Sequence, residues 1–335
     1  MKRNYRLIFG SAVLLLTAAA ALSLLMGRYE IRGADVFKIF LARIMPVEKT
    51  WSELTENMVM LVRLPRILTA ILTGAALSVA GASYQCIFRN PMAAPDILGA
   101  STGAGFGAAL AILMGLSKAQ VTLSAFLASL LCVSLVILSA KVCKGNQVLN
   151  LVLAGIMVSS LFQAGTSYLK LIADPDNALP EITYWFMGSL AGVTTGDLQY
   201  VWLPILVGMA PVFLLRWKMN LLTMDENEAK TMGVNTKRLR ILMILASTLM
   251  TAAAVSVSGM IGWIGLVIPH MARKLAGNDC RHLIPLSAVL GGFFLLCVDD
   301  LGRNLYSTEL PLGIITSVIG APFFLYLMAR KGEWN

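Results

Sequence analysis

A stretch of 32 residues, from 241 to 272, contains no Asp, Glu, Lys or Arg. As one helix it would be about 48 Å long at roughly 1.5 Å per residue, which exceeds a bilayer core of about 30 Å. The sequence Ser-Val-Ser-Gly at 256–259 can interrupt it. We therefore expect two apolar helices here, one over about 241–256 and a short one that contains Pro269.

Composition places the rest of the chain in the same lipid environment. Of its 335 residues, 57% are hydrophobic and 13% are charged, whereas soluble domains carry about 25% charged residues. The net charge of +9 does not indicate nucleic acid, because the basic residues lie in loops between apolar runs, as the positive-inside rule describes. The five cysteines form no CxxC motif, and we expect them to be buried as small hydrophobic side chains.

The apolar runs predict an all-α polytopic membrane protein with about ten membrane helices, in a single transmembrane domain over residues 1–335. The first run is too long for the apolar part of a signal peptide, so we expect it to remain as a helix. The expected helices cover residues 7–27 (the first), 62–172 (the second to fifth), 198–215 (the sixth) and 241–329 (the seventh to tenth). Two short interfacial helices are expected over 35–41 and 182–190.

Two details of these helices depend on single residues. Pro65 is expected in the first turn of the second helix, where its missing N–H costs nothing. Asp299, Asp300 and Arg303 are expected to form a polar turn between the last two helices.

The distribution of charge predicts the orientation. With ten spans, one face carries 17 bases and 6 acids, and the other carries 10 bases and 12 acids. The positive-inside rule places the basic face in the cytoplasm. Both termini and the polar segment 220–240 are therefore expected to be cytoplasmic.

That polar segment, Asn220–Arg240, interrupts the apolar sequence about two-thirds of the way along the chain. Thr223 and Glu226 have the spacing of a capping box, and Gly233 stands where a left-handed residue would end a helix. We expect a short surface helix here. A membrane protein with such a segment on one face is expected to dock a partner there.

The sequence also contains an internal repeat. Residues 73–81 and 251–259 share six of nine positions, and the expected topology gives the two copies opposite directions. We therefore predict an inverted repeat, a common feature of transporters.

Three glycines recur at a spacing of four on the third expected helix, over about 96–116. Gly99, Gly103 and Gly107 form a doubled GxxxG pattern, which lets helix backbones approach closely in lipid. Their expected role is helix packing.

Chemical motifs are scarce. The two histidines form no HExxH motif or Cys/His cluster, and no Walker lysine is present. We therefore expect no catalytic set, metal or cofactor, and a membrane enzyme is disfavoured. Few ionisable residues lie deep in a span, which also disfavours a secondary transporter with a proton or ion relay.

Several strings, in order along nearly the whole chain, resemble the FecCD family of ABC-transporter permeases. They are RLPR (63–66), FRNPMAAPDILG (88–99), YWFMGSL (184–190), AKTMGVNTKRLR (229–240), GWIGLVIPHMAR (262–273) and LPLGIITSVIGAPFF (310–324). The resemblance implies a permease subunit in the cell membrane of a bacterium or archaeon. It also implies a second permease copy as a homodimer, two copies of a cytoplasmic ATPase and an external substrate-binding protein.

The family imports iron–siderophore complexes, haem and cobalamin. A ferric siderophore is the favoured cargo because it is the family's commonest assignment. Cobalamin and haem remain alternatives within the family, and a secondary transporter is the alternative outside it.

Three groups of site residues are expected. The ATPase-coupling residues are Thr223, Asp225, Glu226, Glu228, Ala229, Met232 and Gly233. The resemblance places a cytoplasmic gate at Asn90, Pro91, Met92, Asn146 and Gln147. It also suggests that Arg63, Arg66 and Arg303 dock carboxylates of the binding protein. The alternative for these arginines is that they anchor helix ends or pair with Asp299 and Asp300.

Overall fold

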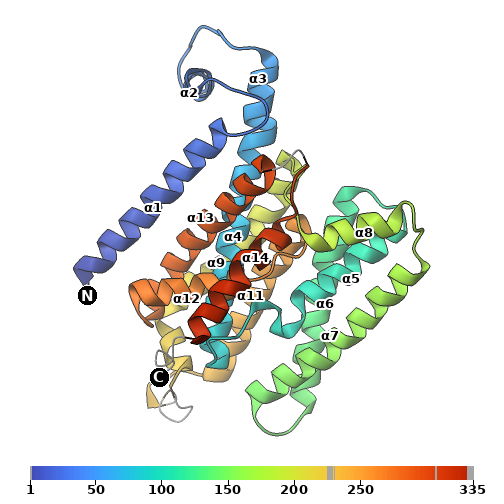
Figure 1. Ribbon diagram of the computed structural model, residues 1–335. Coiled ribbons are helices and arrows are strands. Elements are labelled where there is room, and N and C mark those ends of the chain that lie inside the picture. Colours follow the sequence, from blue (N-terminus) through green and yellow to red (C-terminus); the bar gives the residue numbers. More distant parts are fainter. Residues whose placement is uncertain (1, 225–228, 230, 306–307, 330–335) are drawn as a thin grey trace.

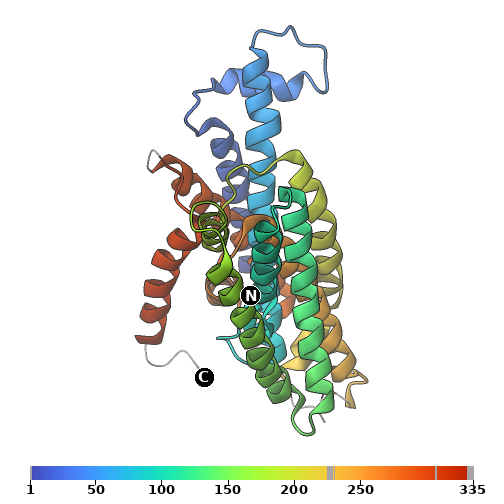
Figure 2. The ribbon, with the colours of Figure 1, turned by 90° about the vertical axis from the view of Figure 1, so that its right-hand side faces the viewer.

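The chain folds as a bundle of helices. The computed structural model describes residues 2–224, 229, 231–305 and 308–329, and these contain helices but no strand. The long helices run side by side between two ends (Figure 1). One end carries α2 (Gly33–Leu41) and α3 (Glu53–Asn57), which stand beyond the other helices in both views (Figures 1 and 2). The end of α9 (Thr195–Leu222) and the start of α11 (Thr236–Ser258) lie at the opposite end (Figure 1).

The elements follow one another in chain order. They are α1 (Lys2–Leu25), α2 (Gly33–Leu41), α3 (Glu53–Asn57), the π-helical turn η1 (Met58–Arg63), α4 (Leu64–Phe88), the 3-10 turn η2 (Pro95–Leu98), α5 (Ala100–Leu113), α6 (Lys118–Val142), α7 (Gln147–Ile172), α8 (Ala178–Met187), α9 (Thr195–Leu222), α11 (Thr236–Ser258), α12 (Ile264–Ala276), α13 (Cys280–Asn304) and α14 (Leu312–Ala329).

Each of the ten expected segments contains a helix, although they are not equally long. Within the described residues, seven helices are long and apolar enough to cross a membrane by length and composition. The apolar helices Ala100–Leu113 and Leu312–Tyr326 are shorter, and α12 contains Pro269 as expected. The two short helices expected over 35–41 and 182–190 are observed as α2 and α8.

Helix α4 forms the centre of the bundle and is buried along most of its length. It packs against α9, α11, α12 and α13. Glycines make this packing close, because a Cβ on Gly81 would overlap the carbonyl of Gly265, and a Cβ on Gly74 would lie 2.8 Å from Cβ of Leu295. Lipid supplies no hydrophobic force between helices, so such backbone contact is a main source of their association.

Pro65 lies in the first turn of α4, as expected, but α4 is not a separate helix at this end. One continuous helix runs from Glu53 to Phe88, and Pro65 lies inside it. The π-helical turn η1 precedes the proline, and the Leu64 N–H donates to Val59 five residues back. The hydrogen-bond ladder therefore changes register next to Pro65, which is where a missing N–H is tolerated.

Two further boundaries differ from expectation. The third helix begins at Ala100, because Gly99 adopts a left-handed conformation after η2. The expected polar turn at Asp299, Asp300 and Arg303 is wrong, since all three residues lie inside α13. Ion pairs described below neutralise their charges, so the helix continues through them.

The predicted repeat is not symmetrical at its last glycine. Gly81 lies inside α4, whereas the aligned Gly259 ends α11 with a φ of 66°. The two glycines therefore serve different purposes, and the inverted repeat stays a prediction.

Candidate functional site

The first expected site comprises the three arginines near the α2–α3 end, and all three are buried. Arg63 is 3% exposed, Arg66 9% and Arg303 7%. The Arg63 guanidinium donates to the carbonyl of Leu24 at 2.6 Å and to the carbonyl of Tyr29. Arg63 thus ties the beginning of α4 to the end of α1.

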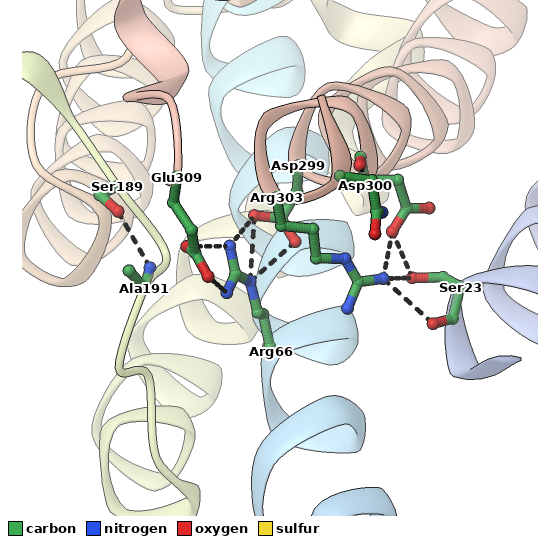
Figure 3. A network of polar contacts seen from close by, with 9 residues as sticks. Ser23, Arg66, Ser189, Ala191, Asp299, Asp300, Arg303 and Glu309 are labelled. Carbon is green, nitrogen blue, oxygen red and sulfur yellow. Dashed lines mark hydrogen bonds and ion pairs between the residues drawn. The ribbon is translucent and has the colours of Figure 1, made fainter. Parts of the chain in front are cut away.

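Arg66 lies at the centre of a network that joins α4, α13 and the segment before α14 (Figure 3). Its Nε and Nη2 atoms each donate to Asp299 at 2.9 Å. The same guanidinium donates to the two carboxylate oxygens of Glu309 at 3.1 and 2.9 Å. These bonds hold the pKa of the Glu309 carboxyl below its usual value. The planar guanidinium of Arg66 therefore binds both carboxylates.

Arg303 completes the network from the next turn of α13 (Figure 3). It donates to the carbonyl of Ser23 at 3.0 Å and to its hydroxyl at 2.6 Å, and it pairs with Asp300. The arginines therefore bind α1, α4 and α13 to one another. Arg66 and Arg303 make the expected alternative contacts with Asp299 and Asp300, whereas Arg63 binds backbone carbonyls. Docking of a partner's carboxylates at these arginines stays a prediction.

The surface at this end is formed instead by the α2–α3 cap, which comprises residues 28–57. Its small core is made by Val36, Ile39 and Trp51, together with Val59 from η1. Large apolar side chains remain exposed on it, and they include Phe37, Ile44, Met45 and Leu54. The sequence signal for this surface was its length and polarity, which predicted a loop with one short helix.

The second expected site is the polar segment after α9. Asp225, Glu226 and Glu228 lie outside the described residues. The expected N-cap conformation at Thr223 is wrong, because this residue has helical φ and ψ of −85° and −12° and ends α9. Its hydroxyl donates to the carbonyl of Asn220 at 2.7 Å.

The end of the segment has the geometry expected for a helix stop. Gly233 has a φ of 75°, and the Val234 N–H donates across it to the carbonyl of Ala229 at 3.4 Å. Ala229 is fully buried, whereas Met232 is 60% exposed. Asn235 then caps α11 by accepting from the Arg238 N–H at 3.0 Å. This segment thus presents an exposed side chain beside a left-handed glycine.

Two distant helices hold the start of the segment. Arg89, which ends α4 in a left-handed conformation, donates to the carbonyl of Leu222 at 2.8 Å and to that of Met224. Asn220 donates to Asp279 at 2.8 Å and accepts from the Cys280 N–H at 2.8 Å. We call residues 220–224 and these contacts the 220–224 anchor.

Asp279 is the acidic member of the anchor, and it caps α13. Although burial raises the pKa of its carboxyl, hydrogen bonds from Asn220 and from the Arg281 amide hold the pKa below its usual value. Sequence reasoning missed Arg89, Asn220 and Asp279, because each contact joins residues 59 or more positions apart.

The third expected site, the predicted gate, comprises the turn at Asn90–Met92 and the start of α7. Asn90 accepts from the Met92 N–H at 2.8 Å, and these two residues and Pro91 are exposed. Asn146 caps α7 by accepting from the Val148 N–H at 2.9 Å, and Gln147 accepts from Arg240 at 3.0 Å. Asn146 and Gln147 line a hollow of about 360 Å³, and Asn90, Pro91 and Met92 do not. Its other lining residues are Phe88, Arg89, Gly145, Val148, Lys237 and Arg240.

The glycines expected at a packing face lie against α6 and α7. A Cβ on Gly103 would lie 2.6 Å from Cβ of Cys132, and one on Gly107 would lie 2.6 Å from Cβ of Ala128. Gly99 differs, because its φ is 76° and its neighbour is the Ser159 hydroxyl. In the part of the chain that the structure describes, no three His, Cys, Asp or Glu side chains gather as a metal site.

Comparisons with known proteins agree along the whole chain. Residues 15–330 match the FecCD transport family. The chain is 38% identical to the molybdate import system permease protein MolB of Haemophilus influenzae, over 98% of this chain and 97% of that protein. It is 41% identical to a probable iron chelatin transport system permease protein of Helicobacter pylori, over 80% of this chain and 81% of that protein. A solved metal-chelate type ABC transporter in an inward-facing conformation has a TM-score of 0.86 and 37% identity, covering 97% of this chain and 99% of that one.

Proposed function

The chain belongs to the FecCD transport family, whose members are permease subunits of ABC importers in the cytoplasmic membrane, and on that premise we propose that it carries a ferric siderophore inward as one half of a permease homodimer. ATP hydrolysis takes place on two separate ATPase subunits. An external binding protein delivers the cargo. The observation that carries this proposal is the similarity over 97% of the chain to a metal-chelate type transporter.

The cargo is the part of the proposal that most needs an experiment. Relatives at similar identity are named for iron chelatin and for molybdate, a bulky chelate and a small oxyanion. The importer would be reconstituted in vesicles with its ATPase and binding protein, and uptake of labelled ferric siderophore, haem, cobalamin and molybdate would be compared. We expect ATP-dependent uptake of the siderophore complex. Uptake of molybdate alone would contradict the chelate assignment, and uptake without ATP would indicate a secondary transporter.

We propose that the segment around Ala229, Met232 and Gly233 docks in the ATPase and couples hydrolysis to transport. Its exposed Met232 and its helix stop give it a defined surface, and the 220–224 anchor ties it to α4 and α13. Hydrolysis-driven movement of the segment would therefore reach two central helices directly. The predicted cytoplasmic orientation of this end supports the proposal.

Gly233 offers a sharp test of coupling, because a Cβ there would meet nothing within 4 Å. Gly233→Val therefore acts only through the backbone, since a β-branched residue disfavours positive φ. We expect it to abolish uptake while ATP hydrolysis continues. Gly233→Asn is the matched control, because asparagine tolerates this conformation. Normal uptake by the valine variant would contradict the coupling role.

A further inference from the structure

Two buried cysteines meet between central helices. Cys86 lies near the end of α4, and Cys280 is the first residue of α13. They are 4% and 1% exposed, and their Sγ atoms are 3.1 Å apart although 194 residues separate them in the chain. The sulfur atoms need to approach by only about 1 Å to reach the S–S bond length of about 2.05 Å.

A cationic side chain stands beside this thiol pair. The Arg273 guanidinium, from α12, is close enough to act electrostatically on both sulfur atoms, and its buried Nη1 atom has no hydrogen-bond partner among the described residues. Nearby positive charge favours the thiolate, which is the form that reacts with oxidants. The two thiols are therefore close enough to form a disulfide, and they lie beside a positive charge that favours their oxidation.

The pair also lies within the structure that holds the 220–224 anchor. Cys86 precedes Arg89 by three residues on α4, and Arg89 donates to the carbonyl of Leu222. The backbone N–H of Cys280 itself donates to Asn220. A covalent bond between the cysteines would therefore join the two helix ends that bind the anchor.

We propose that Cys86 and Cys280 are a redox-sensitive modification site, at which a hydroperoxide closes a disulfide that locks the 220–224 anchor. The two thiols lose two protons and two electrons as the S–S bond forms. The peroxide O–O bond accepts the electrons and breaks, leaving one alcohol and one water. In the reducing cytoplasm the thiols are restored by exchange with a dithiol. The effect on transport rests on the proposed function, whereas disulfide formation does not.

The first test is chemical and is made on the assembled importer. A variant with Cys132→Ser, Cys143→Ser and Cys297→Ser keeps only the proposed pair. After exposure to an organic hydroperoxide, mass spectrometry of proteolytic peptides is expected to show Cys86 linked to Cys280, and the link is expected to disappear with dithiothreitol. Absence of the linked peptide, with the thiols either intact or oxidised to sulfinic acid, would overturn the proposal.

The second test measures the consequence in vesicles. Peroxide is expected to reduce ATP-driven uptake to the level without ATP, and dithiothreitol is expected to restore it. Cys86→Ser and Cys280→Ser should each retain uptake after peroxide. Cys132→Ser, which changes an equally buried thiol on α6, should remain sensitive. If the disulfide forms and uptake is unchanged, the proposal that it locks the 220–224 anchor is overturned. If the reduced importer shows no ATP-driven uptake, the result counts against the proposed function instead.

Discussion

Replacing Arg66 by methionine is expected to destabilise the protein strongly. The change removes the guanidinium but keeps an unbranched apolar side chain about as long as the arginine stem. It leaves Asp299, whose side chain is fully buried, without the three hydrogen bonds that Arg66 donates to it. An uncompensated buried charge of this kind costs about 3–5 kcal/mol. Glu309 loses its partner as well, but its side chain is 29% exposed and water compensates part of that loss.

The assay is the thermal unfolding midpoint of purified protein in one detergent. A change of 1 kcal/mol shifts the midpoint by about 2–4 °C in chains of 150–250 residues, so the fall is expected to be on the order of 10 °C or somewhat less. Arg66→Met with Asp299→Leu is the matched control. Removing both charges is often neutral or stabilising, so the double variant should recover most of the loss. An Arg66→Met variant with an unchanged midpoint but weaker affinity for the binding protein would refute this reasoning and make Arg66 a docking residue.

Three further predictions use matched variants. Gly81→Ala forces a Cβ into the Gly265 carbonyl and should lower the thermal unfolding midpoint. Gly262→Ala is the control and should not lower it, because a Cβ at Gly262 meets no atom within 4 Å. Equal midpoints for the two variants would contradict the close α4–α12 contact. The Glu309–Arg66 pair contributes stability that is fully present above about pH 4.5 and is lost as pH falls through the lowered folded pKa of Glu309. Midpoints measured between about pH 3 and pH 6 should therefore fall more steeply for the native protein than for Glu309→Gln, and parallel curves would exclude the linkage. In the proposed homodimer, Asn90→Cys or Asn146→Cys in both copies should crosslink in one nucleotide state of the ATPase and not in another. Crosslinking that is the same in all nucleotide states would count against a gate.

Local signals predicted most of the helices. Apolar runs located the spans, because lipid requires long uncharged helices whatever their partners are. The helix stop at Gly233 and the interruption near Gly259 also followed from residues within a few positions. In these cases the physical cause lies inside the segment itself.

The arginine network could not be predicted in this way. Arg66 and Asp299 are 233 residues apart, and Arg66 and Glu309 are 243 apart. From the sequence alone, each charged residue is interpreted as a sign of a loop, whereas charged residues that pair with one another can lie within helices. The same reasoning predicted a turn at Asp299, Asp300 and Arg303. Only the packing of α4 against α13 and α1 shows that these charges satisfy one another.

The π-helical turn η1 has a mechanical consequence. The continuous helix of 36 residues from Glu53 to Phe88 is about 54 Å long, so it acts as a rod from the α2–α3 cap to the Arg89 contacts at the far end. Irregular turns are where long helices bend. The turn at Met58–Arg63 is therefore where this rod is expected to bend under a load on the cap, and the contacts of Arg63 and Arg66 hold the rod just after it.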